Sequence, residues 1–228
     1  MTPEVWQAVF LSLKVSAWAM VFAVPVAVPV AYVLARYDFW GKSVINGLVH
    51  LPLILPPVVT GYLLLIVFGR NGALGGPLAE IGIVFAFRWS GAALAAGIMA
   101  FPLIVRAVRL SIEAVDPKLE QAALTLGANR IAIFATVTLP MIMPGILAGT
   151  VLGFAKAMGE FGATITFVSN IPGRTQTIPS AIYAFLQAPG REASAVWLVC
   201  ISIAIAFGAL ILSEIVAKRV ADRVGGVK

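Results

Sequence analysis

The sequence predicts an all-α membrane protein, a bundle of five transmembrane helices formed by a single domain over residues 1–228. Two observations carry this prediction. Apolar residues make up 61% of the chain and charged residues only 11%, whereas soluble domains are about half apolar and about a quarter charged. The apolar residues also fall into long uncharged stretches, each close to the length that crosses a hydrocarbon core of about 30 Å.

The first span is predicted over Val15–Ala35, which contains no charged residue. We expect it to be retained rather than cleaved as a signal sequence, because Glu4 precedes it and no small-residue cleavage site is followed by a polar start. Pro25 and Pro29 lie within the span. We expect a kink there, since neighbouring membrane helices can satisfy the backbone groups that proline frees.

The second span, Asn46–Phe68, is expected to be broken. Pro56 and Pro57 cannot both lie inside an unbroken helix, because each lacks a backbone N–H and clashes with the preceding turn. A break at membrane depth survives only where it faces protein or a water-filled cavity, so the segment either lines a pathway or packs as a kink. For His50, the only histidine, an interfacial hydrogen bond is favoured over a metal or catalytic role.

The third span follows a glycine-rich external loop over Arg70–Ser90, in which a short interfacial helix is expected over Pro77–Ile83. The span itself is predicted over Gly91–Val105. Its first half is rich in Gly and Ala, which let membrane helices approach closely. Pro102 is expected to kink it.

One polar segment, residues 115–140, is long enough to project into water between the third and fourth spans. Asp116 followed by Pro117 is typical of a helix start, and Gly127 is typical of a helix end. The helix between them carries one apolar stripe at helical spacing, formed by Leu119, Ala122, Ala123 and Leu126. This segment is therefore where the protein can contact a soluble partner.

The chain then returns to the membrane. Asn129 can cap a second short helix over Arg130–Val137, which we expect to end before the fourth span, Leu139–Ala155. Lys156 and Glu160 follow, four residues apart on one helix face, and are expected to form an ion pair.

The last span is predicted over Ala193–Ser213. A sixth span is left open for Phe161–Gln187, should that segment re-enter the membrane. The single cysteine, Cys200, excludes an internal disulfide and is expected to be buried as a small apolar residue.

The basic residues give the orientation, because cytoplasmic loops carry the excess of Lys and Arg. They predict an N-terminus outside and a C-terminus in the cytoplasm, so the net charge of +6 is a topology signal and not a nucleic-acid-binding patch. Ten of the 16 Lys and Arg fall on the cytoplasmic side: Arg36, Lys42, Arg106, Arg109, Lys118, Arg130, Lys218, Arg219, Arg223 and Lys228. Four fall outside: Arg70, Arg88, Arg174 and Arg191.

The sequence contains no enzyme motif. It lacks the Gly-x-x-x-x-Gly-Lys-Ser/Thr pattern that holds nucleotide phosphates. One His and one Cys, 150 residues apart, form neither a metal site nor a catalytic pair. We therefore expect a protein that is not an enzyme, binds no cofactor of its own, and takes energy from a partner.

The polar segment resembles the EAA coupling loop in the permease subunits of bacterial binding-protein-dependent ABC importers, through Ala122, Ala123, Gly127, Leu139 and Pro140. Where the family has glutamate before the two alanines, this chain has Gln121, with Glu120 one position earlier. The resemblance implies that the ATPase is contacted by Glu120, Gln121, Ala122, Ala123, Gly127, Ala128, Leu139 and Pro140.

The remainder of the chain is similar to the oxyanion branch of that family, the molybdate, tungstate and sulfate permeases. Gly159–Thr164, Asn170–Gly173 and Thr175–Pro179 carry this resemblance. Leu51–Leu53 and Pro56–Val59 are most similar to the molybdate permease, although sulfate and tungstate remain alternatives.

The resemblance implies a type I ABC importer permease fold in the bacterial cytoplasmic (inner) membrane, surrounded by lipid. It implies a homodimer, two cytoplasmic ATPase subunits that bind ATP and Mg and couple through residues 116–140, and a periplasmic or extracellular oxyanion-binding protein. A gradient-driven secondary carrier is the alternative, which the scarcity of membrane carboxylates disfavours.

A conduit for a tetrahedral dianion needs only weak neutral donors, aided by helix N-termini. The candidate pathway residues are Thr60, Glu160, Thr164, Thr166, Ser169 and Asn170. The alternative interpretation is that these threonines bond only within the helix bundle.

Overall fold

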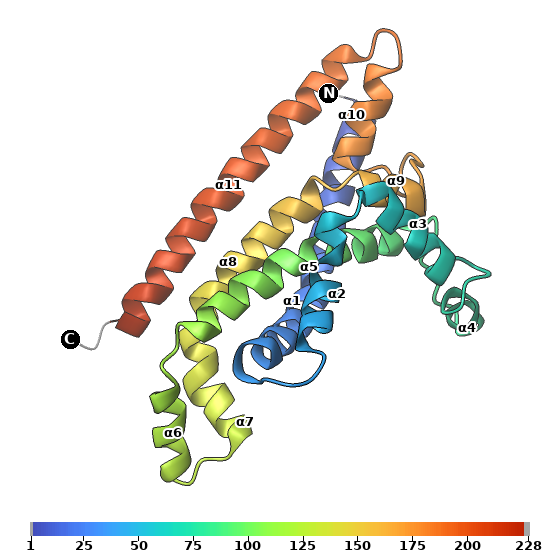
Figure 1. Cartoon of the computed structure of the whole chain (residues 1–228). Helices are drawn as coiled ribbons and strands as arrows, with labels where there is room; N and C mark the ends of the chain where they lie inside the picture. Colours follow the sequence, from blue (N-terminus) through green and yellow to red (C-terminus); the bar gives the residue numbers. More distant parts are fainter. Residues whose placement is uncertain (1, 226–228) are drawn as a thin grey trace.

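The structure is a computed structural model that describes residues 2–225, with side chains as far as Ile215 apart from Ser213. Every regular element in this part of the chain is a helix. Four are long and apolar enough to cross a membrane (Figure 1): α1 (Pro3–Arg36), α5 (Trp89–Glu113), the helix from Arg130 to Met158 that ends as α8, and the first part of α11 (Glu192–Gly225). Lys228, one of the basic residues counted as cytoplasmic, lies outside the described residues.

A fifth span is formed by a broken pair, α2 (Lys42–Ile54) and α3 (Pro57–Phe68), which are bent by 114° relative to each other. The break falls at Leu55–Pro56, where the paired prolines predicted it. Pro57 takes the first helical position of α3, in which a missing N–H costs no helical hydrogen bond. The prediction of five spans is consistent with these elements.

Helix α5 lies at the centre of the bundle, packed between α1 and α8. Its small residues are buried, as predicted, and Gly97 lies against Ala19 of α1. On the α8 side, a Cβ at Gly149 would lie 3.2 Å from the Ala107 side chain. Glycine and alanine therefore set the close spacing of these three helices.

Helix α1 is longer than predicted. It begins at Pro3 rather than near Val15, and it continues through Pro25 and Pro29 as one helix. The additional turns are stabilised by their own apolar contacts with α10 and α11, in a cluster formed by Val5, Ala8, Val9, Ile178, Ala181, Phe185, Ala195 and Leu198.

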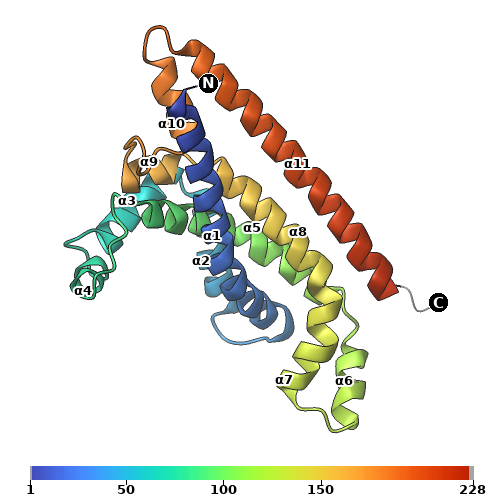
Figure 2. The ribbon, with the colours of Figure 1, turned by 180° about the vertical axis from the view of Figure 1, so that it is seen from behind.

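Three short helices complete the end of the bundle away from α6 (Figures 1 and 2): α4 (Gly75–Glu80), α9 (Gly162–Val168) and α10 (Ile178–Leu186). The loop helix α4 thus begins before the predicted Pro77–Ile83. Helices α9 and α10 are only about 10 and 14 Å long at about 1.5 Å per residue, so neither crosses a membrane alone. The segment Phe161–Gln187 therefore contains two separate short helices.

The polar segment forms a helical elbow that extends beyond the bundle (Figures 1 and 2). Its parts are α6 (Pro117–Thr125), α7 (Arg130–Ile133) and a π-helical turn, η1 (Phe134–Thr138), which runs directly into α8 (Leu139–Met158). The predicted interruption before Leu139 is therefore wrong. Pro140 lacks an N–H, and the wider turn just before it, in which the Leu139 N–H bonds to the Phe134 carbonyl, lets the helix continue.

Helix α11 is the least buried of the spans. It packs against α8 and α10 along one side only, and Cys200 is exposed on it. The expectation that Cys200 is a core residue is thus wrong for the single chain, because the sequence cannot tell a bundle-facing position from one on the outer surface of a uniformly apolar helix.

Candidate functional site

The first helix of the elbow begins and ends as the sequence predicts. The Asp116 carboxylate accepts a hydrogen bond of 2.9 Å from the Lys118 backbone N–H, and Pro117 takes the first helical position. After α6, Gly127 adopts φ +87°, in the left-handed region that favours glycine. The Asn129 side chain then caps α7 by accepting from the Ala132 N–H at 2.8 Å.

The outer face of the elbow presents apolar side chains to solvent. Leu126 at the turn is 88% exposed and Ile131 is 82% exposed. Leu119 and Leu124 are also exposed, as is Ala122, while Ala123 and Ala128 are partly buried. We call these exposed apolar residues of α6, the turn and α7 together the elbow face: Leu119, Ala122, Leu124, Leu126 and Ile131. An apolar surface at the tip of a projecting loop indicates a protein contact.

The Glu120 side chain, in contrast, contacts the bundle. Its Oε1 accepts a hydrogen bond from Thr138 Oγ1 at 2.8 Å and pairs with Arg36 Nη2 at 3.2 Å. The same Arg36 nitrogen also lies 3.1 Å from the Val115 carbonyl. Glu120 and Arg36 are both mostly shielded from solvent, so this contact is stronger than an exposed ion pair.

The neighbouring Gln121 is exposed. Glu120 therefore uses its charge inside the protein, while Gln121 offers a neutral amide to the outside. Leu139 is partly buried and Pro140 is exposed, both at the point where the elbow becomes α8. How these residues contact a partner stays a prediction.

The second region of interest is the place where two helix breaks meet. Helix α9, which follows the break after α8, packs on α3, which follows the break after α2. A Cβ at Gly162 would lie 2.7 Å from Pro57 Cβ, and a Cβ at Gly61 would overlap the Ala163 backbone. The two half-helices thus touch through glycine, at a spacing no larger residue permits without movement.

Glu160 joins these elements. It is 2% exposed, and its Oε2 pairs with Lys156 Nζ at 2.8 Å, as the spacing predicts. Its Oε1 accepts a hydrogen bond from the Ala163 N–H at 3.0 Å. The carboxylate therefore caps α9, so in this conformation it and not a substrate anion occupies the start of that helix.

The predicted pathway hydroxyls mostly bond within their own helix. Thr164 donates to the Phe161 carbonyl at 2.9 Å and Thr166 to the Gly162 carbonyl at 2.9 Å. Thr60 is buried on α3, and its hydroxyl has no partner in the described part of the chain. Thr60, Glu160, Thr164 and Thr166 thus lie on or beside the contact between α3 and α9.

The other two candidates lie after α9. Ser169 is exposed and has φ +64°. The Asn170 amide nitrogen donates to the Ser180 carbonyl at 3.3 Å, while its Oδ1 is buried without a partner among the described residues. No substrate contact is present to test any of the six, so their pathway role stays a prediction.

A buried polar cluster between α9 and α10 was not predicted from the sequence. Its members are Thr175, Gln176, Thr177 and Ser180, together with Ser12 on α1. Ser12 accepts a hydrogen bond from the Ile178 N–H at 2.7 Å, which fixes the start of α10 to α1. The sequence signal that could have revealed this cluster is the run of three polar residues, Thr175–Thr177, directly before the apolar helix α10.

Comparison with known proteins gives consistent matches. A family model described as "Binding-protein-dependent transport system inner membrane component" matches residues 23–222. The chain is 56% identical over 226 residues to the molybdenum transport system permease protein ModB of Escherichia coli (strain K12), covering 99% of each chain. It is 54% identical over 219 residues to the protein of the same name from Haemophilus influenzae, covering 96% of each.

Among solved structures, the chain is similar to a bacterial alginate ABC transporter in complex with an alginate pentasaccharide-bound periplasmic protein. The TM-score is 0.73 at 18% identity, and the match covers 98% of this chain and 80% of that chain. At this identity the similarity shows a shared fold.

Proposed function

Because this chain belongs to the binding-protein-dependent transport system inner membrane components, we propose that it is the permease subunit of an ATP-driven importer that carries molybdate across the bacterial inner membrane. The proposal depends chiefly on the 56% identity, over almost the whole of both chains, to a molybdenum transport permease. The fold is that of a type I ABC importer permease, in agreement with the sequence. A permease subunit of this kind is not itself an enzyme.

The assembly we propose contains two copies of this chain, two cytoplasmic ATPase subunits that bind ATP and Mg, and an external oxyanion-binding protein. A solved relative has a periplasmic protein bound to it, which supports the last partner. The elbow face supports an ATPase contact. Exposed apolar side chains along α2 and α3 support a second copy beside them, among them Val44, Leu48, Ile54, Val58, Tyr62 and Ile66.

In this arrangement the elbow lies in the cytoplasm and the N-terminus of α1 outside. The basic residues near the elbow support this orientation, because Lys and Arg are enriched in cytoplasmic loops. The start of α1, helix α10 and helix α4 then lie on the external side, where a binding protein would dock.

Coupling begins at Glu120. A docking helix that could pivot freely would absorb the movement of the ATPase. Glu120 instead joins α6 to the end of α1 through Arg36 and to the start of α8 through Thr138. Tyr32 of α1 adds an edge-to-face contact with Phe134, their ring centroids 5.2 Å apart. A displacement of α6 is therefore passed to two spanning helices.

The helix from Arg130 to Met158 carries that displacement across the membrane. Its 29 residues extend about 44 Å at about 1.5 Å per residue. Its far end leads through Gly159 into the Glu160 cap and α9, which rests on α3. Movement at the elbow thus reaches the two half-helices that meet at Gly61 and Gly162, where we propose that the pathway opens and closes.

Transport assays test the proposal. The chain, its ATPase and its binding protein are reconstituted in vesicles with ATP inside, and uptake of molybdate, tungstate and sulfate is measured at equal concentration. We expect ATP-dependent uptake in which molybdate competes best. Preference for sulfate would overturn the substrate assignment, and uptake that ignores ATP but follows an ion gradient would overturn the importer class.

A further inference from the structure

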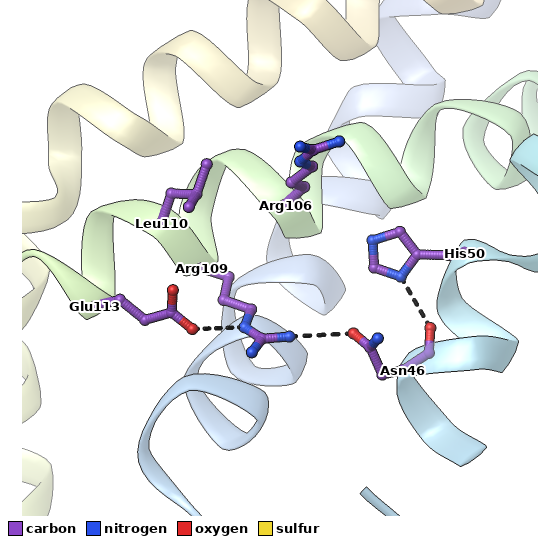
Figure 3. A pocket seen from close by; sticks show the side chains of 6 residues that line it. All are labelled: Asn46, His50, Arg106, Arg109, Leu110 and Glu113. Carbon is purple, nitrogen blue, oxygen red and sulfur yellow. Dashed lines mark hydrogen bonds and ion pairs between the residues drawn. The ribbon is translucent and has the colours of Figure 1, made fainter. Parts of the chain in front are cut away.

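A basic pocket lies between α2 and α5 near the elbow end of the bundle (Figure 3). Its volume is about 300 Å³, at the lower end of the range for ligand pockets. Early residues of α2 and late residues of α5 line it: Asn46, His50, Arg106, Arg109, Leu110 and Glu113. It is separate from the contact between α3 and α9 and from the elbow face.

Hydrogen bonds within the pocket hold one arginine in place. Arg109 Nε pairs with Glu113 Oε1 at 2.7 Å, and Arg109 Nη1 donates to Asn46 Oδ1 at 3.1 Å. These contacts use two of the five N–H groups of the guanidinium. The other three N–H groups of Arg109 are not used by these contacts. The pocket contains one carboxylate, Glu113, and two guanidinium groups, Arg106 and Arg109.

The second guanidinium at the pocket has spare donor capacity. Arg106 is exposed, and no ion pair of its guanidinium occurs among the described side chains. His50 Nδ1 donates to the Asn46 carbonyl at 2.8 Å, and the other ring nitrogen lies toward the side of Arg106 and Arg109 (Figure 3). In the neutral ring that nitrogen is an acceptor, so His50 lines the pocket without adding a donor for an anion. Two guanidinium groups against one carboxylate leave the pocket net positive.

This chemistry selects an anion with several oxygens. Guanidinium groups match the paired oxygens of phosphate-like ions. In Figure 3 the Arg106 and Arg109 side chains point in different directions from α5, so the exposed Arg106 side chain must turn toward Arg109 for both to hold a single tetrahedral ion. A cation is disfavoured, because the one carboxylate is already bonded to Arg109. Of the six side chains that line the pocket, five carry a polar or charged group, and Leu110 is the apolar one.

We propose that this pocket binds a tetrahedral oxyanion. Two sources share that chemistry: the transported oxyanion after it has crossed the membrane, and the phosphate of an anionic lipid headgroup. Binding of the transported oxyanion rests on the proposed function, whereas binding of a lipid phosphate does not.

Occupation of the pocket would also affect the helices around it. Helix α2 has no buried residue, and Arg109 to Asn46 is a direct bond between it and α5. An anion held by Arg106 and Arg109 of α5 that also accepts from the Asn46 amide N–H of α2 adds a second bridge between the same helices. It therefore stabilises whichever conformation keeps α2 against α5.

Two variants test the pocket. Arg106→Gln removes the less constrained guanidinium, and Asn46→Asp adds a carboxylate beside Arg109. The matched control is Arg88→Gln, an exposed arginine at the start of α5, at the other end of the same helix. Unfolding temperatures without ligand show that each variant folds, and because two different variants are used, misfolding of one does not remove the test.

The first arm uses the purified permease with its ATPase in nanodiscs of phosphatidylcholine, which has no net charge, and titrates tungstate by calorimetry. The second arm replaces part of the lipid with phosphatidylglycerol and counts retained lipids by native mass spectrometry. In whichever arm binding occurs, we expect Arg106→Gln to weaken it about tenfold to hundredfold, the loss that follows removal of a charge-assisted hydrogen bond. Arg88→Gln should match the wild type.

Each outcome decides the matter. Variant-sensitive tungstate binding identifies the transported ion as the source, and variant-sensitive phosphatidylglycerol retention identifies lipid. Binding of neither ligand, or binding that Arg106→Gln and Asn46→Asp leave unchanged, overturns the proposal. Molybdate uptake is measured in parallel, so failure of the proposed transport function is seen separately from failure of the pocket.

Discussion

Thr138 donates a hydrogen bond of 2.8 Å to Glu120, which links the start of α8 to helix α6, 18 residues earlier in the chain. Thr138 is fully buried, so the bond is shielded from water. Arg36 completes the contact from α1. One carboxylate thus joins α6 to both α1 and the start of α8, while the elbow face is exposed.

Replacement of Glu120 by Gln should uncouple the elbow from the bundle. The change keeps the size of the side chain but removes the charge opposite Arg36, and we expect a stability loss of about 1–3 kcal/mol. ATP-driven uptake should fall at least about tenfold, while the ATPase still binds, because the elbow face is intact. Glu214→Gln, the same change at an exposed glutamate on α11, is the control and should leave uptake unchanged. Normal uptake by Glu120→Gln would contradict the coupling role.

Leu126→Glu should abolish binding of the ATPase without destabilising the permease. The side chain is 88% exposed, and surface substitutions usually change stability by less than about 0.5 kcal/mol. A charge in an apolar contact loses its hydration without a partner. Co-purification with the ATPase measures the effect. Ile81→Glu, 70% exposed near α4, should leave co-purification unchanged.

Gly127→Ala should distort the elbow, because alanine disfavours the positive φ that Gly127 adopts between α6 and α7. No atom lies within 4 Å of the Cβ position, so any cost comes from φ +87°, about 1–2 kcal/mol for an L-residue. Gly82, with φ +84° and equally open surroundings, provides a control with the same backbone cost. We expect ATPase binding to weaken in Gly127→Ala alone. Equal effects of the two variants would show that general destabilisation, rather than the elbow, is responsible.

Gly61→Ala should separate α3 from α9. The added methyl group would overlap the Ala163 backbone, and overpacking of this kind costs about 1–3 kcal/mol. We expect uptake to fall while the ATPase still binds, because the elbow is distant from this contact. Gly208→Ala, in open space on α11, is the control and should be neutral or slightly stabilising. Unaffected uptake in Gly61→Ala would contradict a gate at this contact.

Local chemistry made much of this fold predictable. Pro56 and Pro57 marked the break in the second span, Asp116 and Pro117 marked the start of the docking helix, and Gly127 marked its end. Each of these signals depends on the backbone of one or two residues, so no knowledge of tertiary contacts was needed.

Features that depend on contacts between distant segments were not predictable in the same way. The start of α1 depends on apolar contacts with α10 and α11 far along the chain. His50 and Arg106 line the same pocket, although they are far apart in sequence. From the sequence, His50 was explained by an interfacial hydrogen bond and Arg106 by the topology signal, so nothing indicated that the two lie together. The inward direction of Glu120 likewise depends on Arg36 and Thr138, which only the folded chain brings together.

The π-helical turn at Phe134–Thr138 sets the direction in which the elbow face points relative to the buried side of α8. A π turn holds one more residue than an α turn, and each residue in a helix corresponds to a rotation of about 100°. Deleting a single residue there would restore an ordinary α-helix and swing the whole elbow about 100° around the axis of α8. The elbow face would then point in another direction, with every side chain on it unchanged.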